Sequence, residues 1–105
     1  MSSQYVIVWE FTVRQENEAE FVKQYGPDGV WARLFRLSDG YLRTELKRDV
    51  ADHLCFLTLD FWQAEEDFNR FRQLNAAEYQ RLDKELEGLT EQETRLGAFW
   101  ITSEG

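Results

Sequence analysis

The chain has 105 residues, of which 20 are acidic and 12 are basic, so its net charge is −8. This charge repels phosphate backbones and anionic lipid surfaces, which argues against nucleic acid or membranes as partners. The length suits one domain, residues 1–105, with a core of its own. A single cysteine, Cys55, excludes an intrachain disulfide and a cysteine-based metal cluster.

Two further features of the composition bear on location and packing. The N-terminal residues MSSQYVIVWEF contain no basic segment and no apolar run long enough for export or membrane insertion, so a cytoplasmic protein is expected. Phe, Tyr and Trp make up 15% of the chain. Such large apolar rings pack cores, interfaces and ligand clefts alike.

The segment YVIVWEFTV, residues 5–13, reads as a strand with two apolar faces. Its odd positions are all apolar, and half of its even positions are apolar too. A half-exposed antiparallel strand alternates apolar with polar residues, so both faces of this strand must be covered.

The next segments predict a broken helix and an edge strand. Helical spacing of apolar residues runs through 16–25, GPDG at 26–29 interrupts it, and a second apolar stripe continues to the Asp-Gly pair at 39–40. Residues 41–49 alternate leucine or threonine with charged residues, as a one-sided strand at a sheet edge does.

The second half of the chain repeats this order of elements. Residues 54–62, LCFLTLDFW, form another two-sided strand, and helical patterns follow over 64–74 and 76–88. TEQE, residues 90–93, is expected to form a turn before a last strand, RLGAFWIT, at 95–102.

The order of these elements predicts an α+β, ferredoxin-like βαββαβ fold with a four-stranded antiparallel sheet in the order 4-1-3-2. The two strands with two apolar faces then lie in the centre of the sheet. Helices cover one face, and a bare apolar face of that size would aggregate. We therefore expect a homodimer in which two sheets pack face to face.

Several segments together resemble the antibiotic biosynthesis monooxygenase-like (ABM) family of the dimeric α/β-barrel superfamily. They are YVIVWEFTV, GPDGVWARLF, DGYLRTEL and LTLDFWQAEEDFNRF, and the likeness spans residues 5–100. The superfamily hosts monooxygenases of aromatic polyketides, haem-degrading oxygenases, lactone isomerases and members with no known reaction. The resemblance therefore implies a scaffold more strongly than a reaction.

The resemblance also implies a place for the substrate, in the cleft between sheet and helices of each subunit. Trp62 matches the tryptophan that closes the third strand in the family. The haem-degrading branch of the superfamily also uses an asparagine in the first strand and a histidine in the helix after that tryptophan. This sequence has neither residue at those places, so haem degradation is not expected. The single histidine, His53, lies in a predicted turn with no second soft ligand nearby, so we expect no metal and no cofactor.

Two carboxylates are the candidate catalytic groups. If Trp62 faces the cleft, the two-residue period of a strand places Thr58 and Asp60 there too. The same period, with the odd face of residues 5–13 turned to the partner subunit, would bring Glu10 into the cleft. Burial would raise the pKa of a carboxyl there and create a proton acceptor near neutral pH.

The expected lining of the cleft is aromatic, and its residues are Trp31, Phe35, Phe68, Phe71 and Tyr79. The leading hypothesis is a cofactor-independent monooxygenase in which Asp60 or Glu10 removes a proton from a small activated aromatic, such as a phenol or anthrone. Trp62 and Tyr79 would position the ring.

The residues leave other functions open. The same base and cleft would suit an isomerase, and a dimeric module that binds a small apolar ligand, or none, needs no chemistry. The two carboxylates could also pair with Arg43, Arg48 or Arg95, and the aromatic stripes could serve only as core. Whether the chain is an enzyme is not decided at this level.

Overall fold

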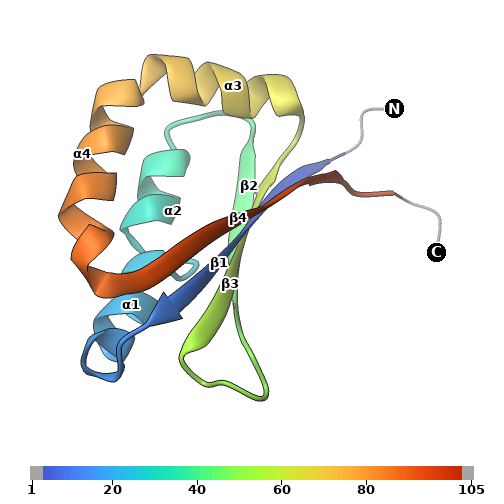
Figure 1. The fold of residues 1–105 in the computed structure, drawn as a ribbon. Helices are drawn as coiled ribbons and strands as arrows, with labels where there is room; N and C mark the ends of the chain where they lie inside the picture. The colour runs from blue at the N-terminus through green and yellow to red at the C-terminus, as the bar shows by residue number, and fades with distance from the viewer. Residues whose placement is uncertain (1–3, 103–105) are drawn as a thin grey trace.

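The computed structural model describes residues 4–102 as a four-stranded antiparallel sheet with helices on one face (Figure 1). The strands are β1 (Tyr5–Val13), β2 (Tyr41–Arg48), β3 (Cys55–Trp62) and β4 (Thr90–Trp100). Their order across the sheet is β2-β3-β1-β4, which reads 4-1-3-2 from the other edge. The predicted ferredoxin-like α+β fold is confirmed.

The helices form two crossovers on the same side of the sheet (Figure 1). They are α1 (Glu18–Tyr25), α2 (Val30–Phe35), α3 (Glu65–Leu74) and α4 (Ala76–Leu86), with short 3-10 turns η1 (Gln15–Asn17) and η2 (Glu87–Leu89). None of the described helices is long and apolar enough to cross a membrane.

The first crossover is broken at GPDG, as the sequence predicts. The end of α1 and the start of α2 approach so closely there that a Cβ atom on Gly29 would lie 2.2 Å from the carbonyl oxygen of Gln24. Such a contact is far inside van der Waals distance, so only glycine fits at this position.

The start of β4 differs from the prediction. TEQE was expected to form a turn, but the strand begins at Thr90, and Gln92 and Glu93 pair with Thr12 and Phe11 of β1. The run of polar residues is compatible with a strand because β4 is an edge strand on which Glu91, Gln92 and Glu93 are exposed.

The core lies between the sheet and the helices and is mainly aromatic. Phe11 of β1 packs against Phe21 and Tyr25 of α1, with ring centroids 5.4 and 5.0 Å away. On β3, the fully buried Trp62 packs against Phe35 and Phe71 at 5.5 and 5.4 Å. Aromatic pairs at these distances add to the free energy of burial.

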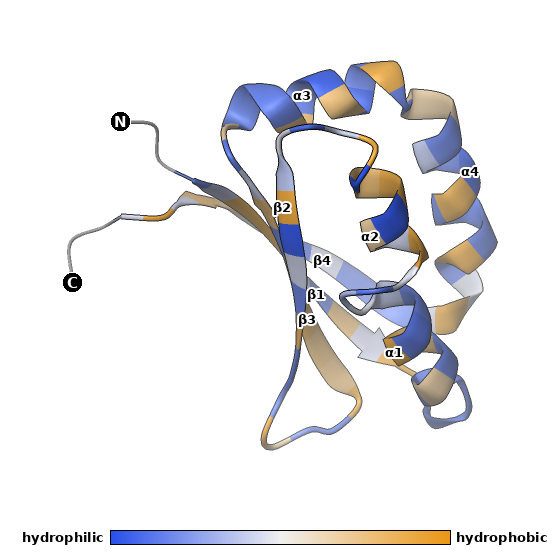
Figure 2. Cartoon of the chain, turned by 180° about the vertical axis from the view of Figure 1, so that it is seen from behind, coloured by the Kyte–Doolittle hydropathy of each residue, from blue (hydrophilic) through white to orange (hydrophobic). Residues whose placement is uncertain are grey.

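The opposite face of the sheet carries no helix (Figure 2). Directly paired residues of antiparallel strands share a face, and here the pairs of β1 and β3 are Val6 with Phe61 and Val8 with Leu59. Arg43 of β2 lies over the ring of Phe61, with its Cζ atom 3.9 Å from the ring centroid. The side of the sheet that carries Val6, Val8, Leu59 and Phe61 is called the outer face below. Val6 and Phe61 are already covered by their neighbours, whereas Val8 and Leu59 are only partly buried.

Candidate functional site

A pocket of about 250 Å³ opens between the helix-facing side of the sheet and the helices. It is small compared with most ligand sites, so it suits a small aromatic ligand. Its walls combine aromatic rings with a few charged groups. The lining residues are Trp9, Phe11, Tyr25, Trp31, Phe35, Thr58, Asp60, Arg72, Tyr79, Asp83 and Glu93.

The pocket forms where short side chains interrupt the aromatic layer. Thr58 and Asp60 occupy alternate positions of β3 and face the helices, between the larger Phe56 and Trp62. Because close packing needs side-chain volume at every position, two small residues beneath Trp31 and Tyr79 leave a hollow that the neighbouring rings do not fill.

Asp60 is held by a short chain of hydroxyl groups on the edge strand β2. Thr44, which lies opposite Asp60 in the β2–β3 register and is buried, donates a hydrogen bond from Oγ1 to Oδ1 of Asp60 at 2.7 Å. The hydroxyl of Tyr41 lies 2.7 Å from the same Thr44 oxygen. No arginine forms an ion pair with Asp60 among residues 4–102, so this carboxylate lacks the partner of an ordinary buried acid.

Burial raises the pKa of the Asp60 carboxyl from 3.8 to about 6, and the hydrogen bond from Thr44 opposes that rise only in part. The side chain is enclosed by protein, and the surface that it still exposes opens into the pocket. A carboxylate with a pKa just below neutral is mostly ionised at pH 7 and is a stronger base than an exposed aspartate. Asp60 thus meets both requirements of a general base, access to a ligand and a matched pKa.

The pocket phenols are protonated at neutral pH. Burial raises the pKa of the Tyr25 hydroxyl, and the nearby Trp31 indole opposes that rise. Burial also raises the pKa of Tyr79, whereas the positive charge of Arg72 lowers it. Both tyrosines can therefore donate or accept a hydrogen bond as neutral groups.

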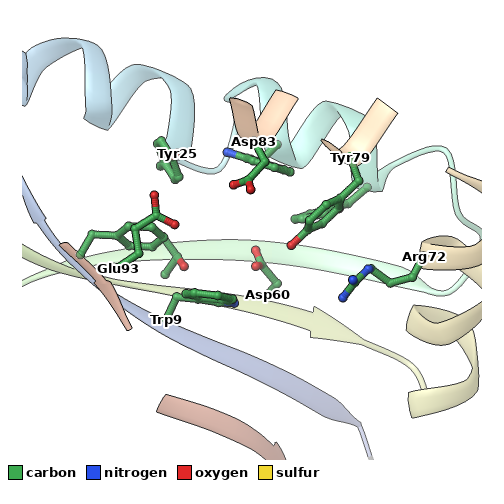
Figure 3. A pocket seen from close by; sticks show the side chains of 11 residues that line it. Trp9, Tyr25, Asp60, Arg72, Tyr79, Asp83 and Glu93 are labelled. Atoms are coloured by element: carbon green, nitrogen blue, oxygen red, sulfur yellow. The ribbon is translucent and has the colours of Figure 1, made fainter. Parts of the chain in front are cut away.

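The charged groups divide the pocket into two ends. Figure 3 shows Glu93 and Arg72 on opposite sides of Asp60, with Tyr25 toward Glu93, Tyr79 toward Arg72, and Asp83 across the cavity from Asp60. One end is therefore acidic and the other carries a guanidinium. A ligand that fills the pocket meets acceptors at one end and donors at the other.

Four of the predicted site residues lie together in the pocket. They are Trp31 and Phe35 of α2, Asp60 of β3 and Tyr79 of α4. Their roles toward a ligand stay predictions, but the two crossovers and the central strand do bring them around one cavity.

Three other predicted site residues do not line the pocket. Trp62 and Phe71 are fully buried, and Phe68 packs on Trp62 with ring centroids 5.3 Å apart. The Nε1 atom of Trp62 has no hydrogen-bond partner among the described residues. Trp62 faces the helix layer as predicted, but the surrounding rings separate it from the cavity.

The prediction that Glu10 shares the cleft with Asp60 is wrong. Glu10 pairs with Leu57 of β3 and lies on the outer face, where the thiol sulfur of Cys55 is 3.8 Å from its Oε2 atom. The odd positions of β1 face the helices instead, because their larger rings fill the deep layer between sheet and helices. One carboxylate, Asp60, therefore remains of the predicted pair.

Sequence reasoning missed several lining residues that spacing could have revealed. Asp83 lies four residues after Tyr79 on α4, so the two share a helix face, and Arg72 stands in the same relation to Phe68 on α3. Trp9 lies opposite Thr58 in the β1–β3 register. Glu93 was missed because TEQE was interpreted as a turn.

The part of the chain that the structure describes contains no group of three His, Cys, Asp or Glu side chains arranged to hold a metal ion. The three pocket carboxylates of Asp60, Asp83 and Glu93 are therefore spread around the cavity and not gathered about one point.

Comparison with known proteins identifies the family. The family model described as antibiotic biosynthesis monooxygenase matches residues 4–82, which is most of the chain, so the protein belongs to this family. A search of curated protein sequences found no match.

Solved structures share the fold at low sequence identity. A protein of Bordetella bronchiseptica assigned to the antibiotic biosynthesis monooxygenases superimposes with a TM-score of 0.72 at 15% identity, with 95% of this chain and 98% of that chain covered. SnoaB of Streptomyces nogalater, described as a cofactor-independent oxygenase, gives a TM-score of 0.67 at 20% identity, with 97% and 96% covered. A conserved protein of Methanosarcina mazei gives 0.70 at 12% identity, with 96% and 95% covered. At these identities the likeness establishes the fold alone.

Proposed function

We propose that the protein is a cofactor-independent monooxygenase that acts on a small activated aromatic of the phenol or anthrone type. Membership of the antibiotic biosynthesis monooxygenase family supports this class, and so does the fold shared with SnoaB, a cofactor-independent oxygenase. The observation that carries the proposal is Asp60, a carboxylate of raised pKa at the base of an aromatic pocket.

In the proposed reaction, Asp60 takes a proton from a phenolic hydroxyl or from carbon next to a carbonyl. The electron pair of the broken bond stays on the substrate and makes it a carbanion-like reductant. Dioxygen accepts electrons from this carbanion and bonds to the carbon as a peroxide. The same carbon then loses its second hydrogen as a proton, the electron pair of that bond forms the carbonyl, and the O–O bond breaks. The outer oxygen atom leaves as water with the two protons taken from the substrate. The substrate supplies all the electrons, so no redox cofactor is required.

The pocket walls fit this chemistry. The rings of Trp9, Trp31 and Phe35 provide flat apolar surfaces for an aromatic substrate. They also keep water away from the carbanion, which water would otherwise protonate before dioxygen reacts. Thr44 and Tyr41 hold the Asp60 carboxylate in place, so they act as positioning residues.

Oxygen consumption tests the proposal. Purified protein is supplied with a panel of phenols, naphthols and anthrones in an oxygen electrode, and the products are identified by mass spectrometry. We expect uptake with at least one substrate, a loss of at least about 100-fold in kcat in Asp60→Asn, and unchanged uptake in Glu10→Gln, the matched control on the other face of the sheet.

The other outcomes distinguish the alternatives. Conversion without oxygen consumption would indicate an isomerase that uses the same base. Binding with no conversion, unchanged by Asp60→Asn, would indicate a ligand-binding module. Oxygen uptake that is indifferent to Asp60→Asn would contradict the assignment of the base.

We also propose that two copies associate through the outer face. On the side of the sheet that no helix covers, Val8 and Leu59 are only partly buried, and Phe99, which pairs with Val6, is 50% exposed. Burying these apolar side chains against a second copy would stabilise the assembly. Native mass spectrometry should give the dimer mass, and Leu59→Lys should give the monomer. A monomeric wild-type protein would contradict this assembly.

A further inference from the structure

Arg72 is the one cationic side chain among the described residues that line the pocket, whereas three carboxylates share that lining. It lies in the last turn of α3, where the helix dipole favours a positive charge. Its Cζ atom is 4.8 Å from the ring centroid of Tyr79 and 5.7 Å from that of Phe68, so the two rings hold the guanidinium at the rim.

The hydrogen-bonding groups of Arg72 are not used by the described residues. Other arginines nearby do have acidic partners. Arg70 of α3 pairs with Asp67, and Arg81 of α4 pairs with Glu78 and Glu85. No such ion pair or hydrogen bond engages Arg72 within residues 4–102. A guanidinium offers five N–H donors, so those of Arg72 remain for water or for a ligand acceptor.

The positive charge of Arg72 can favour the proposed proton transfer to Asp60. A neutral substrate can enter a pocket with three carboxylates, but an anion would be repelled. When Asp60 takes the proton, its negative charge passes to the substrate and the total charge of the pocket stays the same. The transfer is favoured if the new charge spreads away from Glu93 and toward Arg72, which lie on opposite sides of Asp60 (Figure 3).

A phenolate spreads part of its charge onto the ortho and para carbons of its ring, and a conjugated carbonyl at the far end extends that charge to an oxygen atom. We infer that Arg72 binds the carbonyl oxygen of a hydroxyaryl ketone, in which the ionising hydroxyl faces Asp60 and the ring connects it to that carbonyl. This inference rests on the proposed function for the role of Asp60 and narrows it to one substrate class. Arg72 would both orient the substrate and stabilise the anion that proton transfer creates.

A matched pair of probes tests the binding step. The two compounds are para-hydroxyacetophenone and para-ethylphenol, which share a carbon skeleton and differ by the carbonyl oxygen. Affinities are measured by isothermal titration calorimetry for the wild type, Arg72→Gln and Arg70→Gln, the last being a control on the same helix with a solvent-exposed guanidinium. We expect the wild type and Arg70→Gln to bind the ketone about tenfold more tightly than the alkyl phenol, and Arg72→Gln to lose that preference.

The ionisation of the bound ketone provides a second readout, because its absorption moves to longer wavelength when the hydroxyl loses its proton. Arg72→Gln should raise the pKa of the bound phenol by about one unit relative to the wild type, and Arg70→Gln should leave it unchanged. Thermal unfolding of each variant confirms that the fold is intact.

The outcomes separate the inference from the proposed reaction. Equal binding of both probes by the wild type, an unchanged preference in Arg72→Gln, or no binding of either probe would overturn the role of Arg72. An Arg72-dependent preference without oxygen uptake on any hydroxyaryl ketone would leave this role standing and reject the oxygenation.

Discussion

Replacing Asp60 with asparagine should stabilise the protein at neutral pH while it removes the proposed base. Moving the pKa of this carboxyl from 3.8 to about 6 costs about 3 kcal/mol of folding free energy once the group is ionised, at about 1.4 kcal/mol per pKa unit. The sign follows from the direction of the shift. As pH rises, the unfolded chain releases this proton first, so the cost is absent below about pH 4 and complete above about pH 6.

The asparagine side chain does not ionise, so Asp60→Asn removes this cost. Thr44 can still donate its hydrogen bond to the amide oxygen, but burying the amide group offsets part of the gain. We therefore expect the variant to be more stable than the wild type by about 2 kcal/mol at about pH 7.5 and to lose that advantage near about pH 4.

Urea unfolding across this pH range, followed by tryptophan fluorescence, measures the difference. Comparing the variant with the wild type at each pH cancels the titration of the other acidic residues. The control is Glu91→Gln, which neutralises an exposed carboxylate on β4 and should not show this gain in stability at high pH. If the difference in unfolding free energy between Asp60→Asn and the wild type did not change with pH, the raised pKa of Asp60 would be refuted. The physical basis for its role as a base would then be lost too.

Two other variants test the surroundings of Asp60 and the core. Thr44→Val removes the hydrogen bond that lowers the pKa of Asp60, so that pKa should rise above 6, which an NMR titration of labelled aspartate would detect; an unchanged value would contradict the contact. Trp62→Ala should cost about 3–5 kcal/mol in urea unfolding, because it empties the largest fully buried site, whereas a loss below about 1 kcal/mol would contradict its place in the core.

The sequence predicted the fold well because period and topology constrain each other. The strand of residues 54–62 has polar groups only at even positions, so the two-residue period placed Thr58 and Asp60 on the same face as Trp62. The family resemblance of Trp62 then assigned that face to the cleft. The strand of residues 5–13 is apolar on both faces. Its pattern therefore predicts that both faces are covered, but it does not tell which face packs against the helices. For this reason Glu10 was assigned to the helix-facing side, whereas it lies on the outer face.

The charged rim of the pocket was harder to predict for a different reason. Arg72, Asp83 and Glu93 are polar residues on patterns that also describe solvated surfaces. Whether such residues line a cavity depends on how α3 and α4 lie over the sheet. That arrangement is a property of tertiary packing, which the periodicity of a single segment does not predict.

The pH dependence of oxygen consumption tests the central claim, that Asp60 removes the proton that starts the reaction. With the best substrate of the panel, kcat/KM should rise with pH through a midpoint of about 6 as Asp60 ionises, and Thr44→Val should move that midpoint upward. A profile that keeps its height and midpoint in Asp60→Asn would contradict the account.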